Sequence, residues 1–263
     1  MAAGGQPTVN QASARDVQRA KQALEEAMQL ATWHAERGVE VEYKDGGSPV
    51  TAADREIDQL LRTQLPEAGD GWLSEETPDN DARLSCDRVW VVDPVDGTRS
   101  FVAGRSDYSV SIALLIDSQP VLGAVGAPGQ GVQIVGGVGH GVQVTGEFDW
   151  QFPVDDQKPR VLALRSEMRR GDWKHLEDCI SIQPVGSIAL MVAAVAAGSA
   201  DATWTKYPKH EWDVAAGAAL MHAASGECWL PRGGHMLWNR NRPRFLSFAA
   251  AGAEQRARIN EHL

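Results

Sequence analysis

The segment Asp93–Thr98, with the sequence Asp-Pro-Val-Asp-Gly-Thr, carries the densest set of residues that could do chemistry. It follows the apolar residues 90–92, which are typical of a buried strand. Because proline fixes its own φ and lacks an N–H, the carboxylates of Asp93 and Asp96 and the carbonyl of Val95 could converge on one hard cation. The alternative is a proline turn with solvated carboxylates.

The end of the same segment could bind a phosphate. If Thr98 begins a helix, the backbone N–H groups of Gly97 and Thr98 could face a phosphate oxygen, because the first N–H groups of a helix have no partner within it.

Three further segments carry acidic residues where regular structure is expected to begin or end. Glu75 and Glu76 follow a short apolar segment, and they could equally form part of a solvated loop. Asp213 precedes an apolar run and could be a helix cap, and Asp54 could cap a helix together with Thr51. Taken together, these acids without any His or Cys ligand spacing favour Mg²⁺, Mn²⁺ or Ca²⁺ over Zn²⁺.

Composition restricts the partners of the chain. Its 263 residues carry a formal net charge of −10, and no run of Lys or Arg could neutralise a polyphosphate backbone. We therefore expect no nucleic acid polymer and no membrane as a partner, whereas divalent cations could bridge the acids to a small phosphorylated metabolite. Three cysteines without paired spacing, no basic and apolar leader, and no apolar run of about 20 residues predict a cytoplasmic protein.

The elements that must position these acids follow from periodicity and punctuation. Residues 1–14 are expected to be unstructured, and Gly38 and Pro66 are expected to end the first two helices. The expected order is a helix from 17 to the stop at Gly38, a helix from 51 to the stop at Pro66, strands 89–92, 109–116, 121–125 and 132–135, strand 161–164, helix, strand ending at 185, helix from 188, strand 202–204 and helix from 212. This order predicts an α+β half over residues 1–152 and an α/β half over residues 153–263.

Four ordered motifs resemble those of the inositol monophosphatase superfamily. They are residues 51–54 (Thr-Ala-Ala-Asp), 73–76 (Leu-Ser-Glu-Glu), 93–98 and 212–217 (Trp-Asp-Val-Ala-Ala-Gly), and Gly186-Ser187 is a fifth, weaker match. The resemblance implies alternating layers of helix and sheet, like those of sugar phosphatases, with the site between the two halves. It also implies a homodimer.

The resemblance further implies a role for each motif residue. Glu75, Asp93 and the Val95 carbonyl would bind a first Mg²⁺, and Asp93, Asp96 and Asp213 a second. A third ion would share Glu75, Mn²⁺ could substitute, and Li⁺ would inhibit. The remaining residues implied are Asp54 and Thr98 as the pair that orients the attacking water, and Gly97, Thr98, Arg99, Arg165, Ser166, Gly186, Ser187, Lys209 and His210 as substrate contacts.

The branch of the superfamily follows from two segments. Residues 164–167 (Leu-Arg-Ser-Glu) resemble the Ser-Arg-Ser-His segment of the adenosine 3′,5′-bisphosphate branch, although Glu167 replaces the histidine and Leu164 the first serine. Arg165 could instead be a surface residue, and Lys209 and His210 could belong to a solvated loop. The expected function is hydrolysis of 3′-phosphoadenosine 5′-phosphate to AMP and phosphate, a step in sulfur metabolism. The alternatives are inositol monophosphatase or fructose-1,6-bisphosphatase activity, or a catalytically silent metal- or nucleotide-binding regulator.

Overall fold

Two long amphipathic helices form the first layer of the computed structural model, which describes residues 10–38, 41–43, 49–152 and 157–263. They are α1 (Ala14–Arg37) and α2 (Ala52–Gln64). The hydroxyl of Ser13 accepts a hydrogen bond from the Asp16 N–H at 3.1 Å, and the Asp16 carboxylate accepts one from the Ser13 N–H at 3.0 Å. This reciprocal cap fixes the start of α1. Of the stretch expected to be unstructured, residues 1–9 lie outside the described residues, while Ala12 is buried and Ser13 is structured, so that expectation was wrong there.

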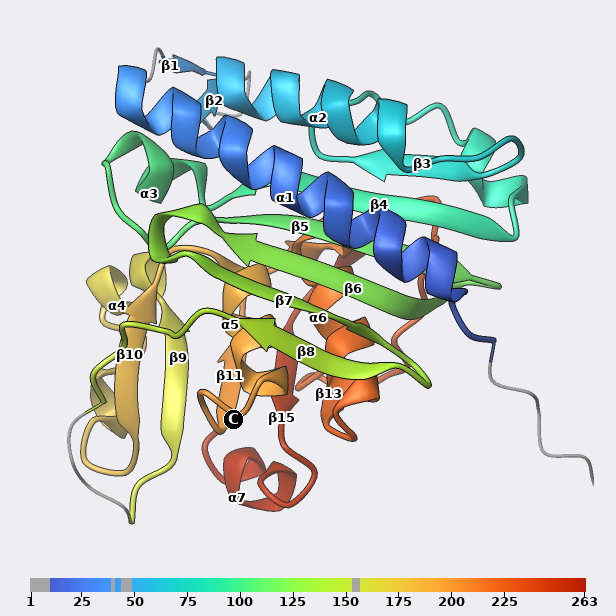
Figure 1. Ribbon diagram of the computed structural model, residues 1–263. Helices are drawn as coiled ribbons and strands as arrows, with labels where there is room; N and C mark the ends of the chain where they lie inside the picture. The colour runs from blue at the N-terminus through green and yellow to red at the C-terminus, as the bar shows by residue number, and fades with distance from the viewer. Residues whose placement is uncertain (1–9, 39–40, 44–48, 153–156) are drawn as a thin grey trace, which may run out of the picture.

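A six-stranded sheet lies beneath these helices (Figure 1). Its order is β3-β4-β5-β6-β7-β8, with β3 parallel to β4 and the other neighbours antiparallel. The strands are β3 (Gly71–Ser74), β4 (Arg88–Asp96), β5 (Ser109–Ile116), β6 (Gln119–Ala127), β7 (Val132–Gly137) and β8 (Gly141–Thr145). The strands predicted between residues 89 and 135 are confirmed. Side chains alternate across β4, so Trp90 and Val92 pack towards α1 and α2 while Val89 and Val91 pack towards the opposite face.

Two buried helices, α5 (Ile188–Ala196) and α6 (Glu211–Ala223), cover that opposite face. Small residues allow this contact to be close. A Cβ added to Gly123 of β6 would lie 2.1 Å from the Ala216 carbonyl oxygen, and one added to Gly217 would lie 2.4 Å from Val192. The absence of side chains at these glycines therefore lets α6 pack directly on β6 and α5.

A second, five-stranded sheet lies below α5 and α6, as Figure 1 shows. Its order is β10-β9-β11-β15-β13. The strands are β9 (Arg160–Leu164), β10 (Ser181–Val185), β11 (Ala202–Thr205), β13 (Glu227–Trp229) and β15 (Phe248–Ala251). Its outer face packs against residues near α4 (Arg165–Arg170) and α7 (Arg256–Asn260). The layers thus alternate helix, sheet, helix, sheet and helix, which confirms the predicted fold class.

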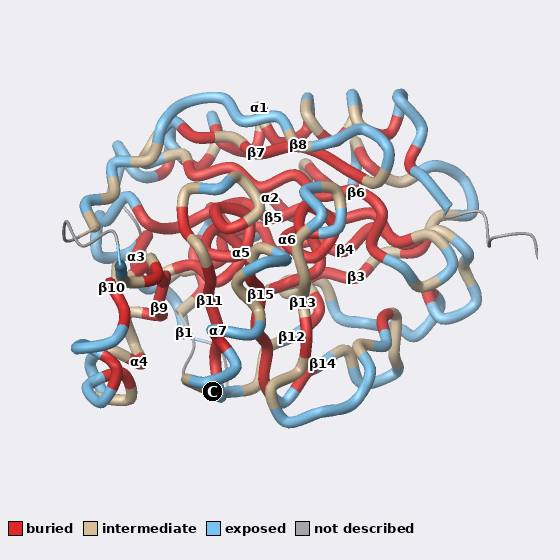
Figure 2. Tube along the Cα trace, turned by 90° about the horizontal axis from the view of Figure 1, so that it is seen from below, coloured by how far each residue is buried: buried red, intermediate tan, exposed pale blue. Residues whose placement is uncertain are grey.

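Several short elements were not predicted. They are β13, β15 and α7 above, and two small sheets that pair β1 (Val41–Tyr43) with β2 (Pro49–Thr51) and β12 (Lys209–His210) with β14 (Arg244–Phe245). Strands of two to four residues are too short to show a reliable alternation of apolar and polar residues. Burial is continuous through the centre of the molecule (Figure 2). In the described part of the chain, no helix is both long and apolar enough to cross a membrane.

Candidate functional site

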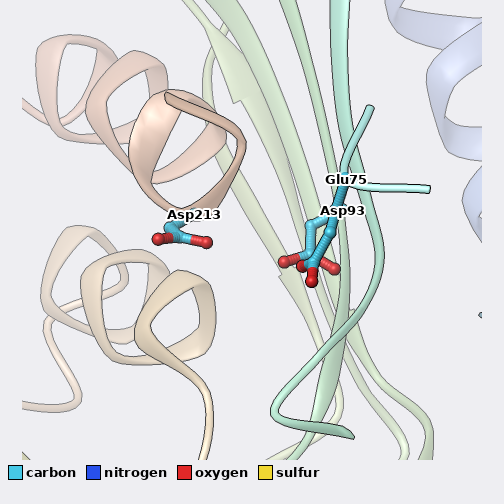
Figure 3. A group of neighbouring side chains, drawn as sticks. All are labelled: Glu75, Asp93 and Asp213. Atoms are coloured by element: carbon cyan, nitrogen blue, oxygen red, sulfur yellow. The ribbon is translucent and has the colours of Figure 1, made fainter. Parts of the chain in front are cut away.

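The pairing of β3 with β4 brings the first two acidic motifs together. The strands are parallel with Ser74 opposite Val92, and the Glu75 N–H donates to the Val92 carbonyl at 3.4 Å. The pairing of the two strands stops at this point, so Glu75, the residue after β3, lies beside Asp93, the next residue of β4. Their side chains point in the same direction in Figure 3.

The beginning of α6 supplies the third carboxylate. Asp213 lies in its first turn, and its Oδ2 accepts a hydrogen bond from the His210 N–H at 2.8 Å. Its side chain faces Glu75 and Asp93 across the gap between α6 and the sheet (Figure 3). One oxygen from each of these three carboxylates lies within 4.8 Å of the others. Asp213 is therefore both a helix cap and a member of the cluster.

Asp96 joins the cluster at an irregularity in the sheet. The register between β4 and β5 shifts between Asp93 and Asp96, so the strand does not keep its regular alternation there. Asp96 Oδ2 accepts hydrogen bonds from the Ser187 hydroxyl at 2.6 Å and from the Ala189 N–H at 2.7 Å. These bonds fix the carboxylate at the start of α5, next to the other acids.

Burial and mutual repulsion disfavour the ionised forms of the three aspartates. Burial and, after it, the nearby charge of Asp96 raise the pKa of Asp213 to about 7, against the opposing effect of Lys209. Burial raises the pKa of Asp96 to about 6, even though the hydrogen bonds from Ser187 and Ala189 act to lower it. The pKa of Asp93 is raised well above its ordinary value by burial and by the charges of Glu75 and Asp96. The ionised form of such a cluster becomes favourable only when cations are bound beside it.

The cluster fits a divalent metal site on its donor chemistry. The acids offer only oxygen ligands, which hard ions such as Mg²⁺, Mn²⁺ and Ca²⁺ prefer. Burial and mutual repulsion raise the free energy of the ionised acids, and a bound cation would offset this cost.

Thr98 and Asp54 form a hydroxyl–carboxylate pair beside the cluster. Gly97 has φ +89°, a left-handed conformation that turns the chain from β4 into α3 (Thr98–Val102). The Thr98 hydroxyl oxygen lies 3.0 Å from the Val95 carbonyl oxygen and 3.5 Å from Asp54 Oδ1. The other carboxylate oxygen of Asp54 accepts from the N–H and the hydroxyl of Thr51 at the start of α2. Capping therefore occupies one oxygen of Asp54 and leaves the other directed at Thr98.

A cavity of about 450 Å³ extends from this cluster. Its lining includes Glu75, Asp96 and Asp213 on the acidic side. Basic residues also line it, and they come from α3 and the turn that follows, from α4, and from β12: Arg99, Arg105, Arg165, Arg169 and Lys209. The cavity therefore combines acidic and basic walls.

The predicted substrate contacts divide into two groups. Those that line the cavity are Gly97, Thr98, Arg99, Arg165, Ser166, Gly186 and Lys209. Ser187 is instead fully buried, and its hydroxyl bonds to Asp96 and Ser109. His210 does not line the cavity, and its ring stacks on Trp212 at 4.4 Å between centroids. The structure thus places Ser187 beneath the site as a support, while the His210 side chain lies outside the cavity lining and caps α6 by accepting a hydrogen bond from the Asp213 N–H.

The contacts of Arg165 and Glu167 were not foreseen from the sequence. Arg165 donates to the Asp107 carboxylate and to the Pro184 carbonyl. Glu167, at the position of the histidine in the related segment, is buried and accepts hydrogen bonds from Thr205 and Trp173. It is not among the residues that line the cavity.

Arg169 is a lining residue that was missed altogether. It follows Arg165 by four positions on α4, so helical spacing places both on one side of the helix. This i, i+4 spacing was the signal in the sequence that could have identified Arg169.

Comparisons with known proteins agree with this geometry. The sequence model of the "Inositol monophosphatase family" matches residues 9–261. A 3′-phosphoadenosine 5′-phosphate phosphatase of Mycobacterium bovis is 37% identical over 186 residues, which cover 66% of this chain and 66% of that protein, just under two thirds of its length. The 3′(2′),5′-bisphosphate nucleotidase CysQ of Escherichia coli K12 is 31% identical over 79% of this chain and 85% of its own.

Two further relatives complete the comparison. An inositol-1-monophosphatase of Mycobacterium leprae is 37% identical over 68% of this chain and 67% of its own. The solved structure of a Thermotoga maritima IMPase superposes with a TM-score of 0.74 over 91% of this chain and 93% of its own, and its 24% identity supports the fold alone.

Proposed function

This chain belongs to the inositol monophosphatase family, and we propose that it is a metal-dependent phosphatase that hydrolyses adenosine 3′,5′-bisphosphate to AMP and phosphate. The resemblance inferred from its motifs is thereby confirmed at the level of the family. Membership implies dependence on divalent metal ions. Mg²⁺ as the ion, two or three ions per site, Mn²⁺ as a substitute and inhibition by Li⁺ are parts of the proposal.

One observation carries the proposal. Carboxylate oxygens of Glu75, Asp93 and Asp213 lie within 4.8 Å of one another beside a cavity into which Thr98 also faces. Acids so close together with so few cations near them are suited to hold metal ions rather than to stabilise the fold.

The residues that would hold the metal are the clustered acids. Glu75, Asp93 and the Val95 carbonyl would bind one ion, and Asp93, Asp96 and Asp213 a second. When bound, the ions would supply Lewis acidity to activate water and to stabilise the departing oxygen.

Thr98 and Asp54 would orient the attacking water. The Thr98 hydroxyl is within reach of Asp54 Oδ1 at 3.5 Å, so it can give its proton to that carboxylate and accept a hydrogen bond from water with its own lone pair. The bonds from Thr51 hold Asp54 in place, and the N–H groups that follow the left-handed Gly97 at the start of α3 would bind the phosphate. These residues would align water and phosphate before reaction.

The basic wall supports a substrate with more than one anionic group. A neutral ring such as inositol offers these residues no charge to bind, whereas a second phosphate does. The names of the relatives from Mycobacterium bovis and Escherichia coli point in the same direction. The relative from Mycobacterium leprae keeps inositol monophosphate as the second candidate, with fructose 1,6-bisphosphate behind it. A catalytically silent regulator is disfavoured because every implied metal ligand and the Thr98–Asp54 pair are present.

A rate comparison tests the proposal. Adenosine 3′,5′-bisphosphate, inositol 1-phosphate and fructose 1,6-bisphosphate are each assayed for phosphate release with EDTA, with Mg²⁺, and with Mg²⁺ plus Li⁺. We expect the highest kcat/KM for the adenosine bisphosphate, no turnover in EDTA and inhibition by Li⁺. A preference for inositol 1-phosphate would replace the proposed substrate, and no turnover of any of them would support the regulator.

A further inference from the structure

The basic residues of the cavity differ in whether their charge is already engaged. Arg165 is paired with Asp107, whose side chain is only 8% exposed, and it also bonds the Pro184 carbonyl at 3.1 Å. Lys209 lies close enough to Asp96 and Asp213 to lower the pKa of both. The positive charges of Arg165 and Lys209 thus already interact with carboxylates of the protein.

Arg99, Arg105 and Arg169 are different. All three are exposed and line the cavity, and none makes an ion pair or side-chain hydrogen bond with another described residue. On a chain with a net charge of −10, three guanidinium groups without a carboxylate partner make part of the cavity lining positively charged. An incoming anion could bind them without first displacing an internal partner.

These arginines come from two neighbouring helices and the turn after the first of them. Arg99 is in α3, Arg105 is in the turn that follows, and Arg169 is in α4. Both views place α3 and α4 at the same edge of the molecule, displaced from α6, which carries Asp213 (Figures 1 and 2). The backbone segments that carry the three arginines thus lie apart from the helix that carries Asp213.

We propose that Arg99, Arg105 and Arg169 form a second anion subsite, which binds the non-reacting phosphate of a bisphosphate substrate while the acid cluster receives the ester that is cleaved. Guanidinium groups suit this task because they bind phosphate oxygens in pairs and stay charged at all relevant pH values. The cavity of about 450 Å³ is large enough for a nucleotide-sized ligand. Arg165, held by Asp107, supports α4 and so positions Arg169. This inference rests on the proposed function and adds which residues select for the second phosphate.

Binding of AMP to the metal-free protein tests the subsite without catalysis. AMP keeps the non-reacting phosphate. In EDTA the acid cluster repels this phosphate, so the affinity for AMP measures its binding to the three arginines. We expect Arg105→Gln and Arg169→Gln each to raise the Kd for AMP roughly 10- to 100-fold in isothermal titration calorimetry. Adenosine should bind equally to all variants.

Arg170→Gln is the matched control. Arg170 neighbours Arg169 on the same helix and is also exposed, but it pairs with Asp172, lies over the Tyr207 ring and does not line the cavity. Its Kd for AMP should equal that of the wild type. AMP binding that is unchanged in the Arg105 and Arg169 variants, or equally weakened in the Arg170 variant, overturns the subsite.

Kinetics then separate the subsite from the proposed function. In Mg²⁺, Arg169→Gln should lower kcat/KM for adenosine 3′,5′-bisphosphate roughly 10- to 100-fold, mainly through KM, and leave that for adenosine 3′-monophosphate unchanged. Equal losses on both substrates would overturn the subsite. A wild-type protein that does not prefer the bisphosphate would count against the proposed function, whereas the AMP titration would still decide the subsite.

Discussion

Replacing Asp96 by asparagine should stabilise the metal-free protein while destroying its activity. Burial raises the pKa of Asp96 from 3.8 to about 6, so keeping its charge in the folded state is unfavourable. At 1.36 kcal/mol per pKa unit, this corresponds to a cost of about 3 kcal/mol. Asparagine removes the charge and keeps an oxygen that can accept from Ser187 and Ala189. The hydrogen bonds of a neutral amide are weaker, which reduces the stabilisation by about 1–2 kcal/mol.

The expected net gain is therefore about 1–2 kcal/mol, or a rise in Tm of about 2–6 °C for a chain of this size. The size of this gain in stability depends on pH. Because the folded-state pKa of Asp96 is raised, this group does not destabilise the wild type below its ordinary pKa near 4. Its destabilising effect is complete above about pH 6. The gain should thus be present at pH 8 in EDTA and absent at pH 4.

Thermal melts at these two pH values, with EDTA and with Mg²⁺, measure the effect, and phosphate release measures activity. With Mg²⁺ the order should reverse, because the wild type gains stability from the ion and the variant loses a ligand for it. Turnover should fall about 10³-fold or more. A variant that melts below the wild type in EDTA at pH 8, or that keeps near-normal turnover, would refute the reasoning.

Asp201→Asn is the control for this experiment. Asp201, just before β11 and outside the acid cluster, accepts from the Arg160 N–H at 2.7 Å and pairs with the Arg160 guanidinium at 2.8 Å. Its replacement should lower Tm slightly at pH 8 and leave turnover intact, so it separates relief of repulsion from a general effect of Asp→Asn changes.

Three further predictions concern the metal, the water and the packing of α6. The rise in Tm caused by Mg²⁺ should be larger at pH 8 than at pH 6, because the ion binds the ionised acids and the pKa of Asp213 is raised to about 7; differential scanning calorimetry with and without Mg²⁺ checks this, and a smaller rise at pH 8 would contradict it. Thr98→Val should lower kcat roughly 100-fold or more with little change in KM, and Thr98→Ser should restore much of it in steady-state assays, whereas equal defects in both would exclude a role for the hydroxyl. Gly123→Ala should destabilise the fold by more than about 2 kcal/mol in urea unfolding, because its Cβ would lie 2.1 Å from the Ala216 carbonyl oxygen; Gly252→Ala, with nothing within 4 Å, should be close to neutral, and similar effects at both sites would show that the contact with α6 is not the cause.

Local sequence determined the regular elements and the acidic motifs. Residues 109–116 form β5 with the predicted bounds, because a largely apolar run between turn residues can be buried on both faces. The helices α1 and α2 follow from their apolar spacing and their caps at Ser13 and Thr51. Short strands such as β15 escaped prediction because Ala249–Ala251 carry no β-branched side chain and are strand only through pairing with β11 and β13.

Tertiary structure alone decided how the side chains are used. The proximity of Glu75 to Asp93 depends on parallel pairing of β3 with β4, and that of Asp213 depends on α6 packing against the sheet. Arg165 lies 58 positions from the carboxylate that neutralises it, and Ser187 lies 91 positions from Asp96. Residue type and spacing predict periodicity and local hydrogen bonds, which act over a few positions along the chain. Which charges are paired and which remain available to a ligand depends on contacts between segments far apart in sequence, and folding alone creates those contacts.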